Sequence, residues 1–384
     1  MIYFDNNATT SIDPAVLEAM LPFLKEQYGN PSSAYSFGKR VAQAVEHARE
    51  QVAALIGCEP SEVLFTSCGT ESDNTALQSA LSIDADRKHI ITSKVEHSAI
   101  IKQAEALARR GYEVTWLDSD TKGRLDLSQL ESAIRPDTAV VSLMWANNET
   151  GVLFPIKEAA EICREQQTLF HTDAVQAVGK IPINLKTTAI QFLSLSGHKL
   201  HAPKGVGALY VSRRARFFPF LVGGGQENKR RGGTENTASI VGLGKAAELA
   251  AAHMQVEEQF VRDLRDTFER QALERIPGVT VNGDREHRLP NTTNLAIEGV
   301  DSEAMLMILD QQGVCCSAGS ACTTGSLEPS HVLKAMGLSN EQARASLRFS
   351  FGRTNTMEEV DRALAILVRA VQKLREMTPG VLAA

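Results

Sequence analysis

Two stretches of sequence decide the fold: Leu169-Phe170-His171-Thr172-Asp173-Ala174-Val175-Gln176 and Gln191-Phe192-Leu193-Ser194-Leu195-Ser196-Gly197-His198-Lys199. Each contains a short apolar run that predicts a buried strand, and each run ends in polar residues. The first strand ends at Asp173, and the second leads into a small, polar turn that carries Lys199. Because ligands of open α/β sheets bind beyond the carboxyl ends of the strands, these two side chains are the first site candidates.

Similar apolar runs recur before this pair and are separated by helical patterns. We expect further strands at Val63–Phe65, His89–Thr92, Val114–Leu117 and Ala139–Trp145. Strands that alternate with helices predict a mostly parallel sheet covered on both faces. Val206–Val211 follows Lys199 too closely for a helical crossover, so this seventh strand is expected to run antiparallel.

Helix signals frame these strands. Asp13-Pro14 predicts a helix start, and the apolar stripe that follows lasts until Gly29. A second helix is expected to stop at Gly57. The run Gly223–Gly233 predicts a surface loop, and a long helical pattern follows from about Thr237 to Arg275.

The last third of the chain mixes strand and helix patterns. We expect strands at Val279–Asn282, Thr293–Ile297 and Ser346–Phe351. The predicted architecture is therefore α/β, with a large domain built on a mostly parallel seven-stranded sheet and a smaller α+β domain. We assign residues 13–257 to the large domain, and residues 1–12 and 258–384 to the small one.

Composition excludes several classes of protein. The 384 residues are 43% apolar and 22% charged, with a formal net charge of −6. This mildly acidic balance favours neither nucleic acid nor a membrane surface as a partner. No apolar run approaches the length of a membrane span, and the first residues lack the pattern of a signal peptide, so we expect a cytoplasmic protein.

The six cysteines do not suggest a disulfide framework in a chain of this length. Cys315, Cys316 and Cys322 lie close together in sequence. Their spacing matches neither a zinc pair nor the common ferredoxin runs, so no metal site is predicted.

Lys199 and Asp173 suit the chemistry of an aldehyde cofactor. A free lysine has a pKa near 10.4, is almost fully protonated at pH 7, and is a poor nucleophile. Condensation with an aldehyde removes that limit, and a carboxylate such as Asp173 beside a pyridine nitrogen makes the ring an electron sink. The alternatives are a surface lysine and a helix-capping aspartate.

Two further segments point to the same ligand. His97 follows the strand that begins at His89, where an imidazole could stack on a cofactor ring. The run Phe65-Thr66-Ser67-Cys68-Gly69-Thr70-Glu71-Ser72 is a strand and glycine turn that opens a helix, whose free N–H groups can hold a phosphate. Ser196 and His198 are additional donors. Each feature alone also fits a loop histidine or an ordinary helix start.

Taken in this order, the segments resemble one family, the NifS/IscS-like cysteine desulfurases, class V of the fold-type I pyridoxal-phosphate (PLP) enzymes. The resemblance runs from Tyr3-Phe4-Asp5-Asn6-Asn7-Ala8-Thr9-Thr10 to Arg348-Phe349-Ser350-Phe351-Gly352-Arg353. Its most specific pieces are Asn147-Asn148-Glu149-Thr150-Gly151, Ser196-Gly197-His198-Lys199, Arg231-Gly232-Gly233-Thr234-Glu235-Asn236 and Ser317-Ala318-Gly319-Ser320-Ala321-Cys322. One departure is Cys68-Gly69, where Gly-Ala is commoner in relatives.

The resemblance implies a role for each matching residue. Lys199 would bind the cofactor covalently, His97 would stack on its ring and serve as a proton relay, and Asp173 would pair with the ring nitrogen. The remaining cofactor contacts it implies are Asn148 and Gln176 at the phenolic oxygen, Gly69, Thr70, Ser196 and His198 at the phosphate, and Thr234 from the other subunit of a homodimer. Arg348, with Asn148 nearby, would bind the substrate carboxylate, and Arg353 is its rival.

The resemblance also identifies Cys322 as the nucleophile, carried on a loop rich in small residues. The predicted function is a cysteine desulfurase that converts L-cysteine to L-alanine, leaves a persulfide on Cys322 and supplies a sulfur-acceptor protein, such as an iron–sulfur scaffold. Two alternatives of the same fold are a selenocysteine lyase and a class V aminotransferase. A third, of a different class, is a non-catalytic sulfur carrier or iron–sulfur scaffold using Cys315, Cys316 and Cys322.

Overall fold

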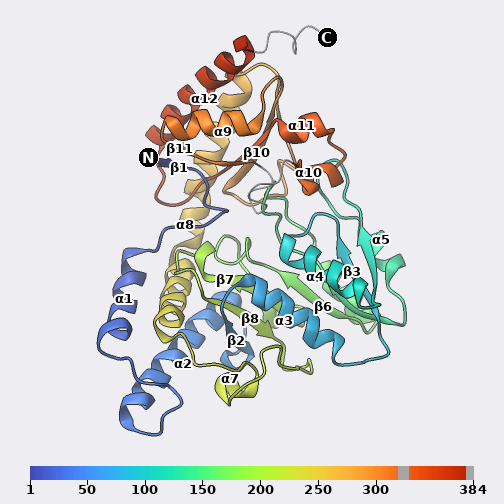
Figure 1. The fold of residues 1–384 in the computed structure, drawn as a ribbon, viewed down its shortest axis with the longest axis vertical. Helices are drawn as coiled ribbons and strands as arrows, with labels where there is room; N and C mark the ends of the chain where they lie inside the picture. Colours follow the sequence, from blue (N-terminus) through green and yellow to red (C-terminus); the bar gives the residue numbers. More distant parts are fainter. Residues whose placement is uncertain (319–327, 378–384) are drawn as a thin grey trace.

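The strands that end at Asp173 and near Lys199 form the centre of a seven-stranded sheet (Figure 1). The structure, a computed structural model, describes residues 1–318 and 328–377. In sheet order the strands are β2 (Val63–Thr66), β8 (Gly207–Val211), β7 (Phe192–Ser196), β6 (Leu169–Asp173), β5 (Thr138–Ser142), β3 (His89–Ser93) and β4 (Glu113–Leu117). β8 runs antiparallel to both of its neighbours and the other pairs are parallel, which confirms both predictions.

β5 is shorter than predicted. It ends at Ser142, whereas the apolar run continues to Trp145. The N–H groups of Leu143 and Trp145 still donate to the β6 carbonyls of His171 and Asp173, at 3.1 and 2.8 Å. The chain therefore follows β6 irregularly beyond the end of the regular ladder.

Helices cover both faces of the sheet because successive strand residues point to opposite sides. On one face, Leu64, Ile90 and Phe192 pack against α3 (Gly69–Leu81) and α4 (Ser98–Arg109). On the other, Phe65, Ile91 and Leu193 belong to a larger core, which also takes side chains from several helices. These are α1 (Pro14–Lys25), α2 (Ser36–Ile56), α5 (Leu127–Ala133), α6 (Ile156–Glu165) and α8 (Thr237–Arg275).

The helix ends follow local signals. Asp13 accepts a hydrogen bond from the Ala15 N–H at 2.7 Å, so it caps α1 as predicted. α1 ends at Lys25 rather than near Gly29, because the N–H groups of Glu26 and Gln27 both turn back to the Pro22 carbonyl. α2 ends at Gly57, whose φ of 65° is the left-handed cap that glycine allows. No helix within residues 1–318 and 328–377 combines the length and apolarity that crossing a bilayer requires.

The C-terminal third forms a second, smaller unit at the top of Figure 1. Its antiparallel sheet has the order β12 (Ser317–Ala318), β13 (Ser346–Ser350), β10 (Thr292–Ile297) and β9 (Val279–Val281). β1 (Ile2–Tyr3) pairs in parallel with β11 (Val314–Cys315) beside it. The helices of this unit are α9 (Ser302–Gln311), α10 (His331–Ala335), α11 (Asn340–Arg344) and α12 (Met357–Met377).

α8 is 39 residues long and runs through both units, from α1 and α2 to α12 (Figure 1). Its residues up to Ala250 join the core of the large unit, and those from Val261 join the core of the small one. The proposed boundary between residues 257 and 258 falls in the stretch between these two contributions.

The prediction of a plain surface loop at Gly223–Gly233 is wrong in one respect. The segment contains α7 (Gln226–Lys229), a turn in which Glu227, Asn228 and Lys229 all have positive φ, and Glu227 is buried. The Glu227 carboxylate accepts both terminal nitrogens of Arg49 at 2.7 Å and the Phe65 N–H at 2.9 Å. A buried ion pair therefore ties this loop to α2 and β2.

Candidate active site

A cavity of about 250 Å³ lies at the carboxyl ends of the parallel strands, closed on one side by β13 of the small unit. Ten residues predicted for the site line it: Gly69, Thr70, His97, Asn148, Asp173, Gln176, Ser196, His198, Lys199 and Arg348. Thr234 is exposed and does not line this cavity of its own chain. Cys322 lies outside the described residues.

Lys199 ends a short 3-10 turn, Gly197–Lys199, directly after β7. Its Nζ donates hydrogen bonds to the backbone carbonyl of Asn7 and, at 2.7 Å, to that of Ala8. Thr10 joins the same turn through its N–H, which donates to the His198 carbonyl at 2.9 Å. The first ten residues of the chain therefore position the amine, a contribution that no side-chain motif reveals.

Asp173 is buried at the end of β6, and its Oδ1 accepts the Val175 N–H at 2.9 Å. Burial raises the pKa of this carboxyl, while the nearby His97 and Lys199 oppose the rise. His97 caps α4 by accepting the Ala99 N–H at Nδ1, at 3.2 Å. In its neutral form the ring therefore carries its proton on Nε2. A protonated ring nitrogen beside Asp173 would satisfy the buried carboxylate.

Behind Asp173 lies a second buried carboxyl, Asp73 of α3, which sequence reasoning missed. Burial, together with the negative charge of Asp173, raises the pKa of Asp73 well above its usual value. His171, 3.6 Å away, gives it no positive charge, because burial lowers the pKa of this imidazole to about 3. Asp73 therefore holds a proton more readily than an ordinary aspartate does, which limits the negative charge at this end of the cavity.

The N-terminus of α3 suits a phosphate. Gly69 opens α3, and a Cβ there would lie 2.8 Å from Val175 Cγ2, so a side chain cannot fill this corner. Ser196 Oγ is buried and has no hydrogen-bond partner among the described residues. His198 bonds Thr9 Oγ1 at 3.2 Å, and burial, aided by neighbouring Lys199, lowers the pKa of its ring to about 4. Hydroxyl, neutral imidazole and helix N–H groups thus converge on one corner.

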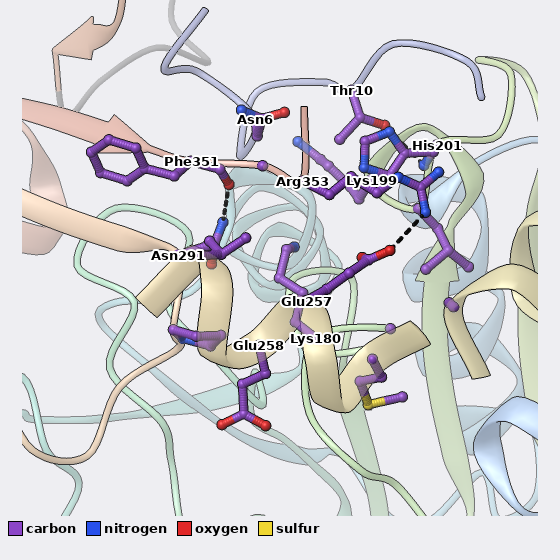
Figure 2. A pocket seen from close by; sticks show the side chains of 17 residues that line it. Asn6, Thr10, Lys180, Lys199, His201, Glu257, Glu258, Asn291, Phe351 and Arg353 are labelled. Atoms are coloured by element: carbon purple, nitrogen blue, oxygen red, sulfur yellow. Dashed lines mark hydrogen bonds and ion pairs between the residues drawn. The ribbon is translucent and has the colours of Figure 1, made fainter. Parts of the chain in front are cut away.

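Arg348 projects from β13 on the face opposite Leu347 and Phe349, which are core residues. Its guanidinium bonds Asp5 Oδ1 at 2.7 Å and the Asn148 carbonyl at 2.9 Å, whereas its Nε has no partner among the described residues. Arg353 lines a neighbouring cavity instead, where it pairs with Glu257 at 3.1 Å (Figure 2). The structure therefore brings Arg348 into the candidate site and leaves Arg353 outside it.

The turn of Asn147-Asn148-Glu149-Thr150-Gly151 explains how Asn148 reaches the cavity. Asn147 Oδ1 accepts the N–H groups of Glu149 and Thr150, both at 2.9 Å. Gly151 has a φ of 79° and closes the turn against Thr292. Asn148 is thereby presented to the cavity, and its buried Oδ1 has no partner within the described chain.

Cys315 and Cys316, which lie close to Cys322 in the sequence, are in surroundings that disfavour the nucleophilic thiolate. Burial raises the pKa of both Cys315 and Cys316, which keeps them as thiols. Cys316 also packs against the apolar core of the small unit. Neither residue lines the cavity of the candidate site.

The cavity fits a phosphorylated pyridine aldehyde. It places an amine at Lys199, a carboxylate at Asp173 and unpartnered polar atoms of Ser196, Asn148 and Arg348 around one space. This fold, with this arrangement of residues, defines the class of fold-type I PLP enzymes.

The chain belongs to the aminotransferase class-V family, whose model matches residues 2–363. It is 52% identical over 379 residues to a cysteine desulfurase from Nostoc sp. strain PCC 7120, covering 99% of this chain and 95% of that one. It is 53% identical to the cysteine desulfurase NifS of Azotobacter vinelandii, with coverages of 98% and 94%. A solved structure described as a NifS-like protein superposes with a TM-score of 0.91 at 35% identity, over 97% of this chain and 99% of that one.

These findings confirm the predicted family and fold. They also confirm the predicted cofactor, because the family depends on PLP.

Proposed function

We propose that the protein is a PLP-dependent cysteine desulfurase that transfers the sulfur of L-cysteine to the thiol of Cys322 and releases L-alanine. The sulfur atom leaves Cβ of the substrate and bonds to Sγ of Cys322, giving a persulfide and no net oxidation or reduction. The observation that carries the proposal is the single cavity that gathers Lys199, Asp173, His97 and Arg348. The names of relatives that are 50–53% identical over nearly the whole chain support it.

PLP linked to Lys199 supplies an electron sink that makes the substrate α-proton acidic and weakens the Cβ–S bond. With PLP bound, Asp173 would hold a proton at the ring nitrogen, and Asn148 and Gln176 would bind the phenolic oxygen. Gly69, Thr70, Ser196 and His198 would hold the phosphate, and His97 would lie against the ring.

The amine of Lys199 moves the α-proton once substrate has taken its place. The carbonyls of Asn7 and Ala8 hold the free amine beside the cavity. His97 relays a proton from its Nε2 to the reacting sulfur or carbon, because its Nδ1 is engaged by the Ala99 N–H.

Arg348 binds the substrate carboxylate, since guanidinium matches that group in a bidentate geometry. Asp5 holds Arg348 in the structure, and the unpartnered Nε leaves a further donor for an incoming carboxylate. Asp5 is in turn anchored by Ser317 Oγ at 2.8 Å, two residues before the segment that leads to Cys322.

The experiment is a spectrum of the purified protein with and without L-cysteine, with alanine measured as product. We expect a yellow protein, cofactor fixed to Lys199 by borohydride, and alanine formed in step with transferred sulfur. Parallel assays with selenocysteine and with amino acceptors separate a selenocysteine lyase and an aminotransferase. A colourless protein that makes no alanine would refute the proposal.

We also infer a homodimer in which Thr234 completes the phosphate site of the partner subunit. The loop that precedes Thr234 exposes Phe218, Phe220, Leu221 and Val222, an apolar run that suits an interface. Two variants with impaired sites, Lys199→Ala and Thr234→Val, should regain up to about a quarter of the wild-type activity when mixed in equal amounts and allowed to exchange subunits. At most about half of the dimers are then mixed, and each mixed dimer has one intact site. If the subunits are shown to exchange and no activity is recovered, Thr234 does not belong to the partner's site.

The sulfur acceptor belongs to the same proposal. A persulfide can be handed to a thiol of another protein, and we propose an acceptor such as an iron–sulfur scaffold in the cytoplasm. Transfer of ³⁵S from L-cysteine to a candidate scaffold, which fails for Cys322→Ala, is the measurement that tests it.

A further inference from the structure

A second lysine, Lys180, lies next to the candidate site and has no assigned role. Its Nζ donates to the Gln176 backbone carbonyl at 3.0 Å and to Gln176 Oε1 at 3.1 Å. Gly179 makes this contact possible, because its φ of 76° turns the chain back, and a Cβ there would collide with Leu200 Cδ1. The side chain of Lys180 thus returns to the residue four positions earlier.

The surroundings of Lys180 do not favour a positive charge. It lines a cavity of about 60 Å³ with Glu257, Glu258, His201 and Arg353, shown in Figure 2. Among the described residues, no carboxylate lies within 4.0 Å of its Nζ. Although part of the residue borders this cavity, burial lowers the pKa of the Lys180 amine to about 7, and nearby Lys199 and Arg348 add to the effect.

The lowered pKa favours the neutral amine, and no ion pair among the described residues accounts for the position of Lys180. The contact with Gln176 does account for it, because Nζ faces two oxygen acceptors.

Lys180 determines which way the Gln176 amide points. With Oε1 turned toward Lys180, Nε2 must face the other way, where it donates to the Asn7 carbonyl at 3.0 Å. That same carbonyl accepts the Lys199 amine. If the Gln176 amide were flipped, Nε2 would face Lys180 Nζ and Oε1 would face the Asn7 carbonyl. The hydrogen bond from Nε2 to the Asn7 carbonyl would then be lost. The amide nitrogen of Gln176 is thus held beside the reactive amine.

We propose that Lys180 is a positioning residue that fixes the Gln176 amide with its N–H donors toward the phenolic oxygen of the cofactor. The inference rests on the proposed function, in which Gln176 binds the phenolic oxygen of PLP. Lys180 would then act on the cofactor indirectly, through the Gln176 side chain.

The test uses the full-length protein stripped of cofactor and then titrated with PLP. Lys180→Met removes the donor at similar length, and Gln176→Leu removes the amide. We expect each variant to weaken PLP binding about tenfold, the upper end of the effect of one hydrogen bond, and to shift the pH midpoint of the visible band of the bound cofactor. The double variant should bind no more than about twofold more weakly than Gln176→Leu alone, because both changes remove one interaction.

Lys186→Met is the matched control, because it removes a lysine charge at an exposed site where the partner is Glu59; its binding and spectrum should equal those of the wild type. The melting temperature of cofactor-free Lys180→Met should equal or exceed that of the wild type. A lower melting temperature with an unchanged cofactor band, or a double variant whose loss is the product of the single losses, would overturn the inference. Failure of the wild type to bind PLP would instead refute the proposed function.

Discussion

The pair formed by Arg49 and Glu227 gives the sharpest stability prediction. Glu227→Gln preserves the shape of the side chain but removes the charge from a contact in which both groups are almost fully buried. Breaking such a pair typically costs about 3–5 kcal/mol, since an uncompensated charge stays inside. Glu46 still contacts Arg49 at 3.2 Å from an exposed position, so we expect the lower end of that range, about 3 kcal/mol.

The same arginine provides the control. Glu46→Gln removes its exposed partner and should cost no more than about 1 kcal/mol, the usual worth of a surface pair. Urea denaturation of the cofactor-free proteins, followed by tryptophan fluorescence, measures both values. If the two variants lose equal stability within about 0.5 kcal/mol, the reasoning from burial is wrong.

The pair also holds the turn around Glu227. Glu227, Asn228 and Lys229 have φ values of 48°, 56° and 66°. Asparagine tolerates this left-handed region, whereas glutamate and lysine cost roughly 1–2 kcal/mol each there. This strain, about 2–4 kcal/mol for the two residues, is similar to the stabilisation that the carboxylate provides. Glu227→Gln should therefore release the turn and speed trypsin cleavage after Lys229, Arg230 or Arg231, while Glu46→Gln leaves cleavage at the wild-type rate.

Further predictions concern the site and its pH dependence. Cys322→Ala should keep the yellow cofactor and form no protein persulfide on incubation with ³⁵S-cysteine; sulfide release at the wild-type rate would contradict its role. Arg348→Lys should raise the KM for L-cysteine about 10–100-fold by removing bidentate binding, with a smaller effect on kcat as the check. Asp173→Asn should abolish desulfuration yet leave the cofactor-free protein at least as heat-stable as the wild type, since burial disfavours the native carboxylate; calorimetry decides. Burial raises the pKa of Glu96 to about 8, so the folded state binds more protons than the unfolded state between about pH 4.5 and 8. Stability should thus fall by up to about 1.4 kcal/mol per unit as the pH rises through this range. Glu96→Gln should flatten the slope in urea titrations at pH 5.5 and 7.5, whereas Glu105→Gln should not, because the Glu105 side chain is 39% exposed and pairs with Lys102.

The sheet was predictable because each strand has its own apolar run and its own polar end. Asp173 and Lys199 could be found in the same way, since parallel strands bring their carboxyl ends to one edge. The antiparallel direction of Val206–Val211 followed from connection length alone.

Other parts of the site left no such signal. The carbonyls of Asn7 and Ala8 belong to the backbone, so no residue type marks their contact with Lys199. The partner of Glu227 lies 178 residues away, and the sequence of its glycine-rich loop indicates only exposure. Lys180 gives no sequence signal of its contact with Gln176, because a lysine after a glycine is also typical of a solvated turn.

The contact between Asp5 and Arg348 joins residues 343 positions apart, one near each end of the chain. During synthesis at about 5–20 residues per second, roughly 17–70 s separate the emergence of these two partners from the ribosome. Until Arg348 is made, the Lys199 amine can contact the carbonyls of Asn7 and Ala8, but the cavity lacks the side that β13 provides. The nascent chain therefore contains the residues between 69 and 199 that are proposed to hold PLP before it contains the arginine that is proposed to bind the substrate carboxylate.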